Sequence, residues 1–300
     1  IGFFIWNTNI KKNFKRISAD IYNSAGNFIF KKNVWSYDDS LYINEWLKKL
    51  RNTQNLEKQI GILNYRGNDF QHESYIFIDN LGAENSTKFS INLNNLVDAA
   101  IYLSVRKAVK PTWLNDRDQF LYPNKKWEKD IEFHNDCLAY TLFNNNIYSK
   151  HGVNHWIPFK EGEVNARTEF ESHFMISFLS GKIVKNAYTA DLFEHLEPHK
   201  NKSKTNWEEG KKREFSIEAQ AVFDAGRELW KYYHTQKNVN VNASLYDIRE
   251  YFQGRNDKGK MNNKSDDEKY NELIGALRES LDILAKKIEP KVYEYEFLMR

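Results

Sequence analysis

The chain has 300 residues and a mass of 35.7 kDa, with 44 basic and 41 acidic side chains and a formal net charge of +3. Hydrophobic residues make up 41% and charged residues 28%, a balance typical of a folded globular protein rather than a disordered one. A single cysteine excludes an internal disulfide framework, and no apolar run approaches the roughly 18 residues of a membrane span. No secretory signal is visible, so we expect a cytoplasmic protein with no membrane partner.

The first eighty residues have the composition of strands. The apolar run at 1–6 (IGFFIW) lacks an initiator methionine, which indicates a piece of a longer polypeptide. Residues 17–22 and 28–34 flank a turn-forming NSAGN segment and are predicted to form a hairpin. Apolar residues at helical spacing predict a short helix at 40–50. The segments 60–63 and 75–78 are predicted to pair as strands on either side of the polar residues 64–69.

After about residue 90 the apolar spacing becomes helical. Ser216 is the expected N-cap of one helix, and Pro111 and Pro290 are expected to stop two others. We therefore predict an α+β fold, with a strand-rich part at 1–90 and a mainly helical part at 91–300. The polar stretches 80–95 and 199–206 are candidate boundaries. Helices are predicted at 96–109, 132–143, 166–179, 217–233, 245–252 and 266–288.

The segment 254–261 (GRNDKGKM) has the glycine spacing of a phosphate-binding loop. It lacks the hydroxyl residue that would hold magnesium, and a predicted helix precedes it instead of a strand, so nucleotide binding is not expected. Arg255, Lys258 and Lys260 still place three cations on a glycine-bounded loop, which suits contacts with the phosphates of DNA. The alternative interpretation is a plain exposed connector.

A second group of candidates lies at 66–71. Arg66 can pair with guanine, and Asn68 and Gln71 with adenine, through paired hydrogen bonds to base edges. A turn between two strands also favours asparagine and glycine, so local turn geometry is the alternative explanation.

No metal site is expected from the sequence. His151 and His155 stand four residues apart, but the glycine and proline nearby indicate a loop, and no glutamate lies between them. His134 and Cys137 would lie one helical turn apart, where core packing of the thiol is the favoured interpretation over a thiol–imidazole pair.

Several longer strings carry a resemblance to a known family. The chain resembles the downstream part of large bacterial adenine-specific (N6) DNA methyltransferases of restriction–modification systems, over nearly its whole length. The strings that carry this resemblance are IGFFIW at 1–6, WLNDRDQFL at 113–121, NHWIPF at 154–159, AVFDAGRELW at 221–230, NASLYDIREYF at 242–252 and the last predicted helix.

The resemblance implies a target-recognition region that binds double-stranded DNA, with a restriction subunit as a further partner. In that family S-adenosylmethionine sits on a glycine-rich loop, and an Asn/Asp-Pro-Pro-Tyr/Phe motif holds a flipped adenine. The five prolines of this chain are never adjacent, and its glycines do not form that loop. The resemblance therefore implies that the strands at 1–90 are late strands of a methyltransferase-like sheet and that the catalytic motifs lie upstream. Catalysis and S-adenosylmethionine binding are then expected of the full-length enzyme and not of these residues. A non-catalytic assembly module of a defence complex and a nuclease are the alternatives.

Overall fold

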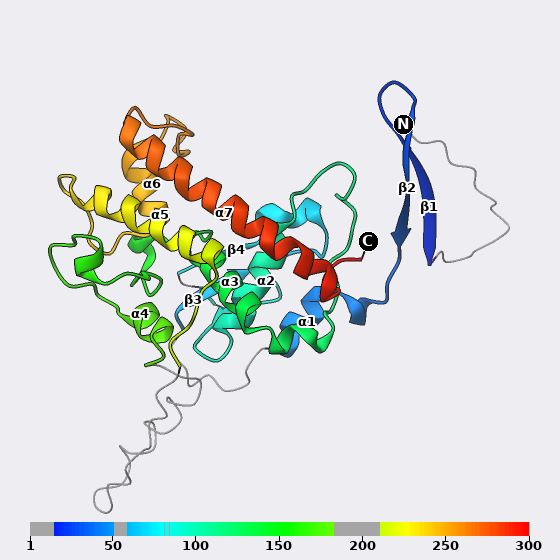
Figure 1. The fold of residues 1–300 in the computed structure, drawn as a ribbon, viewed down its shortest axis with the longest axis horizontal. Helices are drawn as coiled ribbons and strands as arrows, with labels where there is room; N and C mark the ends of the chain where they lie inside the picture. Colours follow the sequence, from blue (N-terminus) through cyan, green and yellow to red (C-terminus); the bar gives the residue numbers. More distant parts are fainter. Residues whose placement is uncertain (1–14, 51–58, 81, 84, 183–210, 300) are drawn as a thin grey trace, which may run out of the picture.

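The computed structural model of the chain describes residues 15–50, 59–80, 82–83, 85–182 and 211–299 (Figure 1). The predicted strand at 1–6 and the predicted boundary at 199–206 lie outside these residues. In the remaining parts the α+β prediction is confirmed, since small antiparallel sheets precede a mainly helical region.

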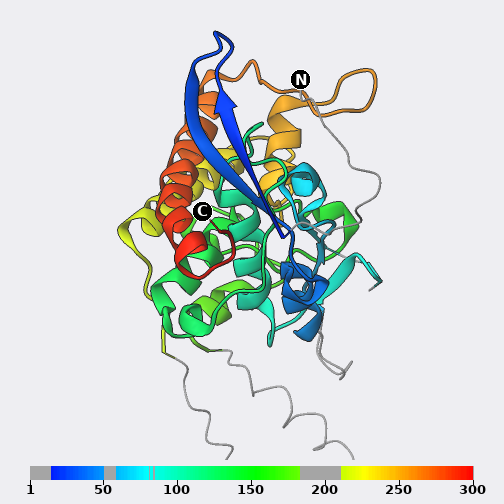
Figure 2. The same ribbon diagram turned by 90° about the vertical axis from the view of Figure 1, so that its right-hand side faces the viewer.

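The predicted hairpin is confirmed as strands β1 (Arg16–Tyr22) and β2 (Phe28–Trp35). Its turn is closed by Asn23, whose Oδ1 accepts the N–H groups of residues 25 and 27, while Gly26 adopts a φ of +81°. Figures 1 and 2 show from two directions that the hairpin stands at one end of the molecule, beside the helical body. Lys32 joins it to the body through an ion pair of 2.8 Å with Asp118.

The second sheet has three antiparallel strands in the order β4-β3-β5, formed by β3 (Gly61–Asn64), β4 (Phe77–Asp79) and β5 (Lys88–Ile91). The predicted pairing of the first two strands is confirmed, although residue 75 belongs to a 3₁₀ helix and the strand starts at residue 77. Strand β5 was not predicted, because its four residues lie within the polar stretch that the sequence indicates as a boundary.

Most of the predicted helices are confirmed within a few residues, and Ser216 caps α5 by accepting the N–H of Ala219 at 3.1 Å. Ser244 and Asp247 form a reciprocal capping box at the start of α6. The helices of the described residues, in chain order, are η1 (Asp39–Leu41), α1 (Ile43–Lys49), η2 (Phe70–Tyr75), α2 (Leu96–Ala108), η3 (Lys125–Lys129), α3 (Ile131–Leu142), η4 (Ser149–His151), η5 (Glu161–Glu163), α4 (Phe174–Leu179), α5 (Ile217–His234), α6 (Leu245–Gln253) and α7 (Glu268–Glu294).

The predicted helix at 166–179 is wrong over its first half, because only α4, at its end, is helical. The preceding residues are held as a loop: Glu161 Oε1 accepts the N–H of Phe170 at 3.0 Å and lies 2.6 Å from Nε2 of His173. Phe170 is nevertheless buried. The phenylalanines at helical spacing therefore do not lie on one helix. Phe170 is buried from a loop, and Phe174 and Phe178 belong to the short helix α4.

The prediction that Pro290 ends the last helix is also wrong, because α7 continues to Glu294. A proline inside a helix removes one N–H donor. Pro290 is exposed, so the helix loses few packing contacts around its ring. The last turn is fastened to the start of α3. Tyr295 donates a hydrogen bond to Asp130, and Lys291 Nζ lies 3.1 Å from the same carboxylate.

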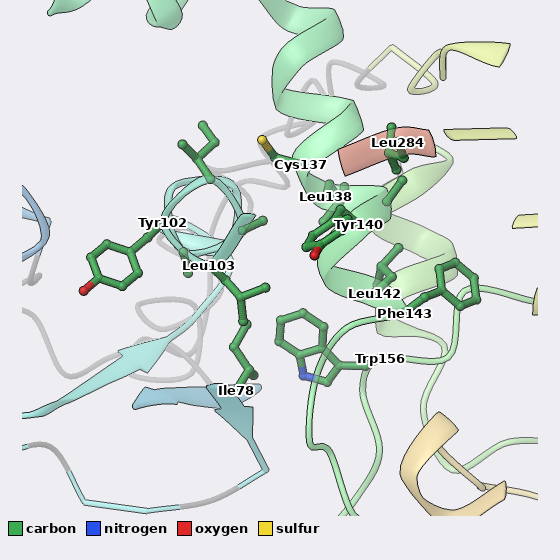
Figure 3. Packing of buried hydrophobic residues seen from close by; sticks show 14 of the residues in the cluster. Ile78, Tyr102, Leu103, Cys137, Leu138, Tyr140, Leu142, Phe143, Trp156 and Leu284 are labelled. Atoms are coloured by element: carbon green, nitrogen blue, oxygen red, sulfur yellow. The ribbon is translucent and has the colours of Figure 1, made fainter. Parts of the chain in front are cut away.

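The apolar faces of α2, α3, α5 and α7 meet in one cluster of buried residues that also includes the three-stranded sheet and α1. Figure 3 shows the ring of Trp156 between Ile78 of β4 and the end of α3. Its Nε1 donates to the carbonyl of Ile60 at 2.8 Å. Gly226 brings α5 against α3, since a Cβ at this position would lie 2.3 Å from the ring of Phe143. The sheet therefore rests on the same core as the helices that follow it.

A charged cluster joins three of these helices. Lys287 of α7 has its Nζ 2.7 Å from Glu132 and 3.2 Å from Asp136 of α3, and 3.1 Å from Glu218 of α5. Burial lowers the pKa of Lys287, but the three carboxylates outweigh this effect and hold it above the ordinary value. One ammonium group thus links carboxylates from both neighbouring helices.

Candidate nucleic-acid interface

The first predicted DNA-reading residues lie on the β3–β4 loop, residues 65–76. Arg66 is exposed, and its guanidinium carbon lies 5.1 Å from the ring centre of Tyr75. Gly67 adopts a φ of +64°, and a Cβ there would lie 2.4 Å from the ring of His72. Glycine therefore permits a tight turn in which His72 packs on the backbone and Arg66 stacks on Tyr75.

The β3–β4 loop is held on its core side by Arg106 of α2, which is completely buried. Its two terminal nitrogens donate to the carbonyl oxygens of Gly67 at 3.0 Å and Asp69 at 2.8 Å. The guanidinium also donates to the hydroxyl oxygen of Tyr102 at 3.1 Å, and its carbon lies 4.7 Å from the ring centre of Phe120. The terminal nitrogens of this buried cation are hydrogen-bonded, whereas its Nε has no hydrogen-bond partner among the described residues. The loop backbone and the terminal nitrogens of Arg106 therefore fix each other.

Asn44 of α1 provides a second support for the same loop. Its Nδ2 donates to the carbonyl of Gly67 at 3.2 Å, and its Oδ1 accepts from Tyr102 at 2.6 Å. Asn68, a predicted base reader, uses its Oδ1 to accept the N–H of Asn44 and its carbonyl to accept the N–H of Phe120. The structure thus gives Asn68 a role in loop geometry, as the alternative interpretation of this segment requires.

Gln71 and His72 are two further polar residues of this loop. Gln71 is exposed, and its Nε2 donates to Asp116 at 3.1 Å, a bond that a base edge could replace. His72 lies 2.7 Å from Asp69, a carboxylate three residues earlier in the chain. The sequence analysis missed His72 and Tyr75. The spacing of Asp69 and His72 at the start of a helical turn is a signal that could have found the first of them.

The second predicted group lies on the α6–α7 loop, residues 254–267. Arg255 does not extend into solvent: its Nε lies 2.5 Å from Glu250, and its terminal nitrogens donate to the carbonyl of Gly259 and the hydroxyl of Tyr246. A backbone bridge between Arg255 and Met261 closes the loop. Arg255 therefore folds the loop onto its own helix.

The two lysines of this loop are placed differently. Lys258 and Lys260 are both exposed, and their backbone N–H groups each donate to Oδ1 of Asn256 at 3.0 Å. Within the part of the chain that the structure describes, neither ammonium group forms an ion pair. The loop therefore presents two uncompensated positive charges on a backbone that is internally bonded.

Glu250 links the α6–α7 loop to the body of the molecule. Its Oε2 accepts the hydroxyl of Tyr148 at 2.6 Å, while Oε1 holds Arg255. Burial acts to raise the pKa of Glu250, but the Tyr148 hydroxyl and the Arg255 guanidinium hold it below the ordinary value. The carboxylate is therefore charged at neutral pH.

The other sequence candidates are not brought together. His151 lies 3.7 Å from Asp79, whereas Nδ1 of His155 lies 2.7 Å from Ser172 Oγ. Cys137 is fully buried, and burial raises the pKa of its thiol well above the ordinary value. His134 contacts the carbonyl of Trp127. Among the residues that the structure describes, no group of three His, Cys, Asp or Glu side chains could hold a metal ion.

A pocket of about 990 Å³ lies away from both loops, between the start of α3 and residues 211–216. Its cations are balanced by acidic residues on the same wall, and Arg213 is bonded to Asn135 at 2.8 Å and stacked on Phe178 at 4.3 Å. Its rim reaches residues 181 and 211, where the described ranges stop. Arg213 is thus held by other residues that line this pocket.

Comparison of the chain with protein-family models, with curated proteins and with solved structures finds no match. None of the helices in the described ranges is long and apolar enough to cross a membrane. A functional assignment therefore depends on the resemblance stated above and on the geometry of the two loops.

Proposed function

We propose that this chain is the DNA-binding, target-recognition part of an S-adenosylmethionine-dependent adenine-N6 DNA methyltransferase. The observation that carries the proposal is the β3–β4 loop, which Arg106 holds from the core while Arg66 and Gln71 stay exposed. Base recognition needs donors and acceptors that are positioned before DNA arrives, and rigid supporting contacts provide this. In this role the chain supplies DNA contacts and no catalytic residue.

The two loops have different tasks in this proposal. Arg66 reads guanine through a paired hydrogen bond, and Gln71 exchanges Asp116 for the edge of an adenine. Lys258 and Lys260 bind phosphates, which fixes the position of the duplex without reading its sequence. The complete enzyme then turns the target adenine out of the duplex and methylates it with S-adenosylmethionine.

The test for base reading compares two exposed arginines. Duplexes selected from a random-sequence pool by the parent chain define a preferred site, and Arg66→Ala should relax one base of it, costing about 1–3 kcal/mol at that position. Arg167→Ala is the matched control, because Arg167 is equally exposed and lies on a different loop. If both variants select the same sequences as the parent, this loop does not read DNA.

The test for phosphate binding uses the lysines. Affinity for duplex DNA should fall steeply with salt, with a slope of log affinity on log salt near −3 if about three phosphates are neutralised. Lys258→Ala should weaken all sequences alike and reduce the slope by about one, whereas Lys125→Ala should change neither. An affinity that does not depend on salt would exclude this mode of binding.

A second candidate function has one specific observation in its favour. The β1–β2 hairpin exposes large apolar side chains, with Phe28 56%, Ile29 49% and Trp35 39% exposed. Since exposed apolar patches mark interaction surfaces, we also infer that the chain could act as an assembly module of a restriction or defence complex. A photo-crosslinking residue at Phe28 in the native complex should then capture a partner subunit, and one at Lys125 should not.

A further inference from the structure

A separate pocket of about 290 Å³ lies where α6 and α7 meet the end of α3. The pocket is lined by apolar residues and by two arginines, one from α6 and one from α7. The residues that shape it are Tyr140, Asn144, Leu245, Arg249, Leu277 and Arg278. None of the DNA-binding candidates of either loop lines this pocket.

Arg249 is joined to the hydroxyl of Tyr270 through the side chain of Gln253. Burial raises the pKa of Tyr270 to about 12, while the positive charges of Arg249 and Arg278 act to lower it. The Tyr270 hydroxyl donates to Oε1 of Gln253 at 3.0 Å, and Nε of Arg249 approaches the same oxygen at 3.4 Å. Arg249 and Arg278 thus both line this pocket.

Neither positive charge is neutralised by the protein. In the ranges that the structure covers, Arg249 and Arg278 form no ion pair. The carboxylate that lines the pocket, Asp282, lies 3.3 Å from Lys110 Nζ instead. Since both guanidinium groups are positively charged, an anion bound between them would interact favourably with each.

We propose that this pocket is a phosphate-binding site in which Arg249 and Arg278 are the ligands. A guanidinium presents its N–H groups as a fork that matches the oxygens of a phosphate, and two forks from different helices can hold one phosphate from two sides. The pocket volume is at the lower limit of small-molecule sites, which suits a phosphate group better than a large ligand. The phosphate can belong to a nucleic-acid backbone or to a free phosphate or phosphomonoester.

Titration calorimetry with inorganic phosphate tests the site directly. The parent chain should bind phosphate, and Arg249→Gln and Arg278→Gln should each weaken binding about tenfold or more, because a hydrogen bond to a charged group is lost. Arg167→Gln should leave the affinity unchanged, and circular dichroism confirms that each variant is folded. Absence of phosphate binding by the parent, or equal binding by folded pocket variants, overturns the proposal.

Duplex DNA distinguishes the two sources of phosphate. If the pocket variants also bind duplex DNA more weakly, with a salt slope reduced by about one, the site takes a backbone phosphate. If they lose inorganic phosphate but keep the DNA affinity of the parent, the site takes a free phosphate or phosphomonoester. Either result supports the phosphate site, and neither depends on the Arg66 test of DNA reading.

Discussion

The β3–β4 loop and the α6–α7 loop both present cations to solvent, but they are stabilised in different ways. The first is held by Arg106 and Asn44, side chains that come from separate helices of the core. The second is closed by Arg255 and Asn256, which belong to the loop itself, and by Glu250 one turn earlier. The β3–β4 loop is thus held by side chains from distant parts of the chain. The α6–α7 loop is held mainly by its own residues.

This difference suits different tasks in DNA binding. Base edges differ by the position of single donors and acceptors, so a group that reads them must be held accurately. A phosphate backbone offers the same charge at every step and tolerates adjustment of a flexible lysine. Four changes test whether the two loops are supported as described.

Replacing Arg106 with methionine should have the largest effect. The carbonyl of Asp69 and the hydroxyl of Tyr102 would lose the donor that Arg106 provides, and the carbonyl of Gly67 would keep only Asn44, so the free energy of unfolding should fall by about 2–4 kcal/mol. Urea unfolding measures this, with Arg167→Met as the exposed control. A parent-like stability would show that the buried guanidinium does not support the loop.

Replacing Gly67 with alanine should cost about 1–3 kcal/mol, because the residue has a positive φ and the new Cβ would collide with His72. Gly259→Ala in the other loop is the matched comparison. Gly259 has a φ of +71° but no heavy atom within 4 Å of an added Cβ, so only the backbone strain remains there. Equal losses of unfolding free energy in the two variants would contradict the close packing of His72.

Replacing Arg255 with glutamine should lower the free energy of unfolding only slightly, since its ion pair with Glu250 is partly exposed. The local effect should be clearer than the global one. The N–H of Gly259, which donates to the carbonyl of Asn256 at 2.8 Å, should exchange faster with deuterium, while the N–H of Phe120 at the other loop should not. Uniform exchange rates across both loops would argue against local closure by Arg255.

Acid should have the smallest effect and should act on one loop only. The pKa of Glu250 in the folded chain lies below its ordinary value of 4.5, so its ion pair contributes fully above about pH 4.5. That contribution is lost as the pH falls through the folded pKa, and the Gly259 N–H should then lose protection. Arg106 bonds neutral carbonyls, so the Phe120 N–H should stay protected through the same range. Simultaneous opening of both loops would indicate global unfolding.

The sequence predicts the parts of this arrangement that depend on neighbouring residues. The turn at 23–27, the cap at Ser216 and the long apolar face of α7 follow from local patterns, and the structure confirms them. The candidate cations of both loops were also found by residue type and by glycine spacing. The expected helix end at Pro290 is wrong, because the contacts of Tyr295 and Lys291 with Asp130 outweigh the tendency of proline to end a helix.

The support of the β3–β4 loop could not be predicted, because it joins residues that are distant in the chain. Arg106 lies 39 residues from Gly67 and 37 from Asp69, and in sequence it is an ordinary basic residue in the last turn of a helix. Its apolar neighbours Val105 and Ala108 hint at burial, but they do not indicate which carbonyls it bonds. Such pairings depend on the packing of α2 against the sheet.

The contacts of residues 295–298 have a consequence for the order in which the molecule assembles. Phe297 packs edge-on against Trp46 and its carbonyl accepts the N–H of Leu121, so a segment near the end of the chain completes the surroundings of an early helix. A ribosome adding about 5–20 residues per second needs roughly 10–35 s between Leu121 and Phe297. During that time the Trp46 ring lacks one of its aromatic neighbours, so the surroundings of α1 are complete only after Phe297 has been added.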